Sequence, residues 1–187
     1  MEEFQRREKV LLEIVETREE KEHFHQDIEL LYVLEGKIEL YIGGQKIVMY
    51  DEDVMIINAN KRHYLKSLGE VLYVKLTIMY ELFSDILNNY EMLFLCDSAR
   101  NIDVAYTGLR KLIQQLLGHY LSNKGKVTDF AYISLCYQIM DYICMHFLIQ
   151  SSDLPEKEES DKYQLRIQQI DNYIRTNYRS AISMKEL

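Results

Sequence analysis

Hydrophobic and polar residues alternate along much of residues 10 to 78, and this period of two is that of β-strands with one buried face. The segment KIELYIGGQKIVMY, which starts at residue 37, shows the pattern most clearly. Its Gly43 and Gly44 supply the positive φ angles that a two-residue hairpin turn requires. The apolar run VMII, which starts at residue 54, is suited to a strand buried on both faces. Several short strands joined by tight turns predict a β-sandwich or barrel.

The hydrophobic period lengthens to between three and four residues at about residue 80, as expected of amphipathic helices. Three such patterns follow, over residues 82–93, 109–120 and 130–147. The third is apolar on more than one face, so other helices, the barrel or a second copy of the chain must cover it. Its spacing is that of a helix-pairing seam and predicts a homodimer through the helical segment. The seam consists of Phe130, Ile133, Tyr137, Met140, Cys144 and Phe147.

The chain divides into four segments by these patterns. Residues 1–79 are expected to form the β domain, and residues 80–150 a helical linker or dimerisation segment. The stretch SSDLPEKEESDK opens a polar linker over residues 151–163 and contains the only proline of the chain. Residues 164–187 begin a further helical unit.

The last segment carries the start signals of two helices. Ile167, Ile170 and Ile174 lie on one side of the first. Ser183 and Glu186 have the spacing of a capping box at the start of the second. The sequence ends within one turn of that start, and a single turn is not stable alone. We therefore expect this sequence to be part of a longer protein, truncated inside a domain.

Composition and charge describe an ordinary globular protein, with 48% hydrophobic and 28% charged residues. A net charge of -8 argues against nucleic-acid binding by this chain itself, because attraction to phosphate needs a basic surface. The N-terminus lacks the apolar core of a signal peptide. The most apolar stretch, residues 130–149, is interrupted by polar side chains and falls short of a membrane span. We expect a cytoplasmic protein without a membrane partner, with its three cysteines reduced and buried.

The stretch HFHQDIELLYVLEG, residues 23–36, places three possible metal ligands in a strand pattern. Side chains alternate across a strand, so His23, His25 and Glu29 face the same way if the strand is unbroken. Leu31 continues that face. The pattern therefore predicts a cluster of ligand side chains on one face of the barrel.

The same stretch fits the pattern HxH, three residues, Glu, six residues, Gly, which ends at Gly36 and resembles the first motif of the cupin superfamily. The second cupin motif brings a histidine from another strand, and EDVMIINANKRH supplies His63 at the matching place. The resemblance implies a mainly β, cupin-type jelly-roll barrel. It also implies that the side chains of His23, His25, Glu29 and His63 converge.

Four positions depart from the cupin pattern. Glu52, Asn58 and Asn60 stand where cupins usually carry Gly, Pro and Gly. Thr17 stands in place of the leading glycine of the first motif. These departures concern the turns and leave the ligand residues in place.

The order of the segments resembles that of a bacterial transcription regulator of the AraC family, in which a cupin-like sensor precedes a helical linker and a DNA-binding domain. The segment IDNYIRTNYRSAISMKEL resembles the start of that domain, whose first helix commonly ends in a YI…NY pattern. The resemblance implies a small-molecule effector in the barrel and a homodimer through the helices. It implies DNA contact only through a helix-turn-helix domain that lies beyond this sequence.

Three histidines and one carboxylate suit a divalent metal such as Zn, Ni, Fe or Mn. The same side chains, together with Leu31, would alternatively line a pocket that hydrogen-bonds an organic effector without metal. Tyrosine is abundant, at fifteen residues, and its apolar ring and hydroxyl suit a sugar-like or aromatic effector. The tyrosines expected on barrel strands are Tyr32, Tyr41, Tyr64 and Tyr73.

We expect a sensor rather than an enzyme, because the sequence offers no separate acid–base pair or nucleophile constellation. The first alternative is a metal-dependent cupin enzyme, such as a dioxygenase or isomerase. The second is a degenerate cupin that serves only for dimerisation. His119 and His146 lie on predicted helices without a partner at ligand spacing, so we assign them structural roles.

Overall fold

The structure, a computed structural model, describes most of the β domain and the helices that follow it. The predicted linker over residues 151–163 and the capping box at Ser183 and Glu186 lie outside the described residues. Four residues of the last predicted segment are described and are helical. The described residues are 9–17, 19–80, 82–83, 93–123, 129–149, 166, 170, 173 and 174.

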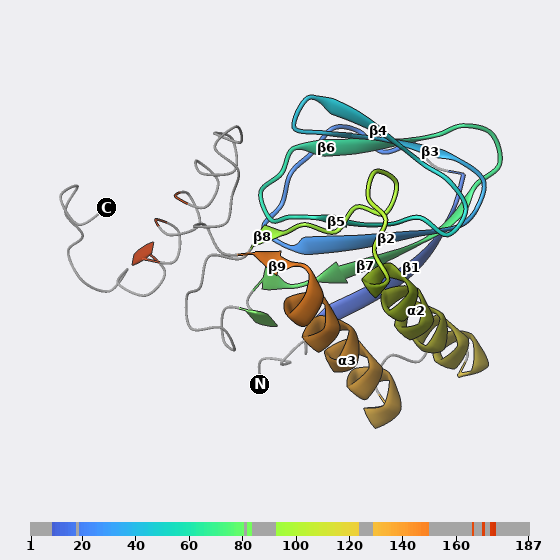
Figure 1. Ribbon diagram of the computed structural model, residues 1–187, viewed down its shortest axis with the longest axis vertical. Helices are drawn as coiled ribbons and strands as arrows, with labels where there is room; N and C mark the ends of the chain where they lie inside the picture. The colour runs from blue at the N-terminus through green and yellow to red at the C-terminus, as the bar shows by residue number, and fades with distance from the viewer. Residues whose placement is uncertain are drawn as a thin grey trace, which may run out of the picture.

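Two antiparallel sheets face each other and form the β domain (Figure 1). One has the strand order β1-β7-β2-β5 and the other the order β4-β3-β6. The predicted sandwich of short strands is therefore confirmed. The strands are β1 (Val10–Glu16), β2 (Ile28–Glu35), β3 (Ile38–Ile42), β4 (Gln45–Met49), β5 (Val54–Ile57), β6 (His63–Ser67) and β7 (Leu72–Ile78).

Two helices of the described chain, α2 (Ala105–Ser122) and α3 (Phe130–His146), lie on the outer face of the four-stranded sheet (Figure 1). They correspond to the second and third helical patterns of the sequence. His119 of α2 lies with its Nε2 2.9 Å from a carboxylate oxygen of Asp129, the residue that caps α3. This contact gives His119 a structural role.

The first predicted helix, over residues 82–93, is wrong at its end. Leu82 and Phe83 are helical and residues 84–92 lie outside the described part, but Leu93 and Phe94 form the short strand β8 (Leu93–Phe94). β8 pairs with β9 (Leu148–Ile149), which follows α3. Local apolar spacing cannot predict this pairing, because the partner strand is distant in the sequence.

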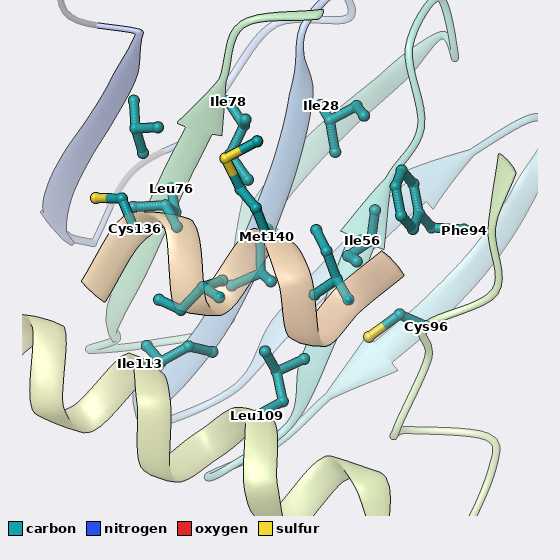
Figure 2. Packing of buried hydrophobic residues seen from close by; sticks show 14 of the residues in the cluster. Ile28, Ile56, Leu76, Ile78, Phe94, Cys96, Leu109, Ile113, Cys136 and Met140 are labelled. Carbon is teal, nitrogen blue, oxygen red and sulfur yellow. The ribbon is translucent and has the colours of Figure 1, made fainter. Parts of the chain in front are cut away.

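Apolar side chains form two layers, one between the sheets and one between the four-stranded sheet and the helices. β5 serves both, because Met55 and Ile57 face the other sheet while Val54 and Ile56 face the helices. The predicted burial of this strand on both faces is confirmed. Figure 2 shows the second layer, in which strand residues meet helix residues such as Leu109 and Met140.

The predicted seam on α3 is divided by its packing. Met140 and Phe147 are only 4% and 5% exposed, because they lie in the apolar layer between the sheet and the helices, where Phe147 stacks on Tyr106 of α2. Phe130, Ile133 and Tyr137 remain 92%, 41% and 46% exposed. Met140 and Phe147 are therefore covered within this chain, which leaves Phe130, Ile133 and Tyr137 as the exposed part of the predicted seam.

Residues other than glycine adopt the backbone conformation expected of glycine at three of the departures from the cupin pattern. Thr17, Glu52 and Asn60 have φ angles of 22°, 68° and 60°. The predicted hairpin turn keeps its glycines, and Gly43 and Gly44 have φ angles of 56° and 79°. The turns are thus retained although their residues changed, at some cost in backbone strain.

Gly36 occupies a position where a side chain cannot fit. Its φ is +97°, and an added Cβ would lie 2.5 Å from the carbonyl oxygen of Glu70. We expect Gly36→Ala to lower the free energy of unfolding by about 3 kcal/mol, because strain and a backbone clash combine. Gly43→Ala is the control, since nothing lies within 4 Å of its added Cβ, and should cost about 1 kcal/mol. Equal losses in urea denaturation would contradict this account.

The helices and cysteines of the described residues bear on two expectations from the sequence, and burial of the cysteines is complete for only two of the three. No helix in the described ranges is long and apolar enough to cross a membrane. Cys96, Cys136 and Cys144 are free thiols, the first two buried and the third partly so. Burial raises the pKa of Cys144 to about 11 and that of Cys136 to about 12, so these thiols are poor nucleophiles.

Candidate functional site

Four predicted ligand residues meet at one end of the β domain. Glu29 lies near the start of β2 and His63 at the start of β6, on the facing sheet. The expected unbroken strand is not formed, because β2 begins only at Ile28. His23 is instead held by paired backbone hydrogen bonds with His63, of 3.0 and 2.9 Å. His25 is held by the 2.7 Å bond from the Asn60 amide to its carbonyl oxygen.

The four side chains converge within a small volume. One potential ligand atom from each of His23, His25, Glu29 and His63 lies within 4.8 Å of the others. The Nε2 atoms of His25 and His63 lie 3.2 and 3.3 Å from the two carboxylate oxygens of Glu29. The ring centroids of His23 and His63 are 4.3 Å apart. The structure therefore brings together the four residues that the two motifs single out.

Backbone carbonyl groups fix the orientation of all three imidazole rings. Nδ1 of His23 lies 2.8 Å from the carbonyl oxygen of Lys21, and Nδ1 of His63 lies 2.7 Å from that of Lys61. Nδ1 of His25 makes the same contact with Asp27, at 3.0 Å. A carbonyl oxygen can only accept, so each Nδ1 is the donor and each neutral ring carries its lone pair on Nε2.

Three polar atoms at the centre of the cluster are buried without a hydrogen-bond partner. They are Nε2 of His25, Nε2 of His63 and Oε2 of Glu29. Their mutual distances are short, yet none of them meets the geometry of a hydrogen bond. Buried polar atoms are nearly always satisfied, so these three indicate a missing partner at the point they share.

Charge at the cluster favours an ionised carboxylate. Burial opposes the ionisation of Glu29, but His25, His63 and the Lys75 ammonium outweigh it and hold the pKa of Glu29 well below its usual range. The carboxylate of Glu29 in turn raises the pKa of His25, against the effect of burial. A buried anion flanked by imidazole lone pairs is suited to binding a cation.

A buried ion network behind Glu29 was not predicted from the sequence. Lys75 of β7 lies with its Nζ 3.8 Å from Glu29, 3.1 Å from Glu20 and 3.5 Å from Glu13. Lys75 and Glu20 are each only 8% exposed. Burial would lower the pKa of Lys75, but the carboxylates of Glu29 and Glu20 outweigh this and raise it. A lysine within the β-rich segment VLYVKLTI was the available signal, since charge inside a buried strand needs a partner.

The turn before His63 is joined to β8 by a second unpredicted contact. The Asn58 side chain accepts from the Phe94 amide at 2.8 Å and donates to the Phe94 carbonyl oxygen at 2.9 Å. Asn58 is one of the residues that depart from the cupin pattern. The side-chain amide of Asn58 thus holds β8 against the turn that positions His63. Because β8 pairs with β9, which follows α3, the end of α3 is linked to the same turn.

Leu31 and the four strand tyrosines, which are expected in an effector pocket, lie in different layers of the fold. Leu31 is fully buried between the sheets, two residues beyond Glu29 on the same face of β2. Tyr73 also lies in that layer, whereas Tyr32 faces the helices. Tyr41 and Tyr64 stack at 4.4 Å between ring centroids, on the face of their sheet opposite to Leu40 and Leu65. All four tyrosines lie on strands of the β domain, as expected, but only Tyr73 faces the interior between the sheets.

Two facing antiparallel sheets with a histidine and glutamate cluster at one end define a jelly-roll domain of cupin type. The family model described as Cupin domain matches residues 10–80. Residues 10–80 are therefore a cupin domain, to which α2 and α3 are added.

Solved structures of cupin proteins resemble this chain. A cupin superfamily protein from Desulfitobacterium hafniense is 22% identical, with a TM-score of 0.37, over 38% of this chain and 68% of that protein. The cupin domain of Cnp3 from Schizosaccharomyces pombe is 19% identical, with a TM-score of 0.39, over 46% and 66% of the two chains. A predicted oxalate decarboxylase from Thermotoga maritima is 17% identical, with a TM-score of 0.36, over 38% and 68%. No curated protein matches this chain.

Proposed function

We propose that the cupin domain binds one divalent metal ion through His23, His25, Glu29 and His63. The observation that carries this proposal is that three buried atoms have no hydrogen-bond partner, namely Nε2 of His25, Nε2 of His63 and Oε2 of Glu29. Backbone carbonyl groups orient the imidazole rings of the three histidines, as is typical of histidines that bind a metal. Three nitrogen donors and one oxygen donor suit Zn, Ni, Fe or Mn. The residues present therefore fit a metal, which when bound would act as a Lewis acid on an oxygen-containing ligand.

We further propose that the domain is the sensing region of a transcription regulator of the AraC type. This proposal is supported by contacts that join the cupin domain to its helices. Gln114 of α2 donates to the Tyr32 hydroxyl of β2 at 2.8 Å, and Nε of Arg110 donates to the Glu52 carbonyl oxygen at 2.6 Å. Together with the Asn58 contact to β8, they would carry a shift in the barrel to both helices.

The regulatory part of the proposal also rests on the resemblance of residues 170–187 to the start of a helix-turn-helix domain. DNA would be contacted by that domain, while this chain carries a net charge of -8 and would be repelled by a duplex. The effector would bind at the cluster, beneath which Leu31 of the same strand face is buried. A sugar-like molecule remains the proposed class, because hydroxyl groups can bind a metal and accept or donate hydrogen bonds.

We propose that two copies of the chain pair through the exposed stripe of α3, defined as Phe130, Ile133 and Tyr137. An exposed apolar stripe on a helix is commonly covered by a partner. Replacing Ile133 and Tyr137 with Glu should therefore yield monomers in analytical ultracentrifugation, with the circular dichroism of the β domain unchanged. Leu121→Glu is the control, since Leu121 is 58% exposed and lies on α2. Monomers of the unmodified chain at high concentration would contradict the proposal.

A metal-dependent cupin enzyme is the second candidate function, and one observation favours it. Glu20 is a buried carboxylate whose Oε2 lacks a hydrogen-bond partner, and its Oε1 accepts from Lys75 beside Glu29. A carboxyl group so placed could transfer a proton to a molecule bound at the cluster. The structure thus supplies an acid–base candidate that the sequence patterns did not indicate.

Metal analysis and a ligand screen separate these functions. Protein purified without a histidine tag is analysed for metal and then screened by thermal shift against sugars and other small molecules. Bound metal with a ligand-dependent rise in Tm and no product supports the sensor. Bound metal with conversion of the ligand, followed by product analysis, supports the enzyme. Absence of both metal and ligand response would contradict both and leave a dimerisation module.

A further inference from the structure

A cleft of about 510 Å³ lies beside the cluster of His23, His25, Glu29 and His63, and none of these four residues lines it. Its walls are the β3–β4 turn on one side and residues 93–101 on the other. Ile42, in one wall, is paired in register with His63. Lys61, at the cleft, is the residue whose carbonyl oxygen fixes the His63 ring. The cleft therefore lies at the same end of the β domain as the cluster.

The wall formed by residues 93–101 lies outside the matched cupin segment and is firmly held. The Ile56 amide donates to the Cys96 carbonyl oxygen at 2.9 Å, and the Ser98 amide donates to that of Val54 at 3.0 Å. The Asn58 amide group fixes Phe94 from the floor of the cleft. A volume of this size, already formed, is in the range of small-molecule sites.

The lining of the cleft combines apolar side chains with two cationic side chains at its rim. Ile42 and Leu95, the second of which is 51% exposed, supply apolar surface, and the more buried Met55 and Phe94 also line the cleft. The charged side chains of the lining are Lys61, Arg100 and Asp97, which sum to one positive charge in a chain of net charge -8.

Arg100 is held in place across the cleft. It donates from Nε to Asp97 and from Nη1 to Gln45 of the opposite wall, the second bond at 3.0 Å. A guanidinium group has five N–H donors, so these contacts leave donors for a bound anion. Asp97, which is only 6% exposed, fixes the direction of the group. An oriented guanidinium over an apolar floor matches a carboxylate attached to an apolar body.

We propose that this cleft binds a small organic carboxylate with an apolar body, with the carboxylate on Arg100 near Lys61 and the body against Ile42 and Leu95, next to Met55. The site goes beyond the proposed metal centre and does not depend on it. Because its wall includes Asn58 and β8, a ligand here would contact the segment that joins the His63 turn to the end of α3.

Methyl NMR of the full chain tests the proposal, with benzoate, phenylacetate and hexanoate as probes and their amides as neutral counterparts. The ¹³C-methyl resonance of Met55, assigned with Met55→Leu, should shift on addition of at least one acid, with a Kd below about 1 mM. The matching amide should bind at least tenfold more weakly, because it lacks the charge. The Met145 resonance, from an exposed site on α3, should not move.

Substitutions at the rim locate the carboxylate. Arg100→Gln should weaken binding at least tenfold. Since Arg100 also holds Asp97, Lys61→Gln provides a second variant that leaves that pair intact and should weaken binding about threefold. Arg62→Gln is the control, because Arg62 is 67% exposed and contacts Glu22 instead.

The titration is repeated after metal removal with a chelator, so that failure of the cleft and failure of the metal centre give different results. Binding that survives chelation supports the cleft as a separate site. Binding that needs the metal would overturn it, and so would the absence of a Met55 shift for every acid up to about 10 mM. Equal affinity for acids and amides, or unchanged affinity in both rim variants, would also overturn it.

Discussion

Replacing His63 with Ala should lower the affinity of the protein for a divalent metal more than 100-fold. His63 is only 1% exposed, and its Nε2 is one of the buried atoms without a partner. Loss of an outer-shell partner of a metal ligand typically costs 10- to 100-fold, so loss of a proposed ligand itself should cost more. Competition with a chromogenic chelator measures the affinity directly. Glu29→Gln should give a comparable loss, because it removes the negative charge.

The matched control is His119→Ala. His119 contacts Asp129 at the start of α3 and lies outside the cluster. Its replacement should leave the metal affinity within twofold of the original. If His63→Ala retains the original affinity while folding normally, the metal is bound elsewhere and the proposed site is wrong.

Replacing Lys75 with Met should lower the free energy of unfolding of the metal-free protein by about 3 to 5 kcal/mol. The side chain of Lys75 is 10% exposed and that of Glu20 is 6% exposed, so removal of the ammonium leaves buried carboxylates without their cation. Glu29, 3.8 Å from Lys75, loses its cation as well. Urea denaturation at constant pH measures the loss.

Metal should reduce the effect of Lys75→Met, because a bound divalent cation would offset the charge of Glu29. The double variant Glu20→Gln, Lys75→Met should recover part of the lost stability, since one uncompensated carboxylate is removed. Lys46→Met is the control, because Lys46 pairs with Glu39 at the surface and should change the midpoint far less. A loss for Lys75→Met no larger than that for Lys46→Met would show that the buried network does not stabilise the fold.

The parts of the fold that follow from local patterns could be predicted from the sequence. The Gly43–Gly44 turn and the doubly buried strand β5 depend on neighbouring residues, and both were correct. Strand β8 depends on pairing with β9, far along the chain, and its apolar residues fit a helical spacing equally well. The predicted seam on α3 was divided for a similar reason, since spacing does not distinguish a partner chain from the protein's own sheet and helices.

The candidate site could be predicted in its residues but not in its surroundings. The motif spacing singled out His23, His25, Glu29 and His63, although the strand expected to align them is interrupted before Ile28. The hydrogen bonds from the imidazole rings to backbone carbonyl groups depend on where those carbonyl groups lie in the folded chain, and residue types alone do not specify this. Lys75, Glu20 and Asn58 were missed because each acts through a contact with a residue distant in the sequence. Such contacts become visible only once the strands are paired.

X-ray absorption spectroscopy at the edge of the bound metal tests the central claim most directly, because it reports the identity and number of the coordinating atoms. The protein is purified without a histidine tag, loaded with one equivalent of Zn, and measured beside the His63→Ala variant loaded in the same way. The account predicts scattering from three imidazole rings and carboxylate oxygen at about 2.0 to 2.2 Å, with one imidazole fewer in the variant. Sulfur at about 2.3 Å, or an imidazole count that His63→Ala leaves unchanged, would contradict it.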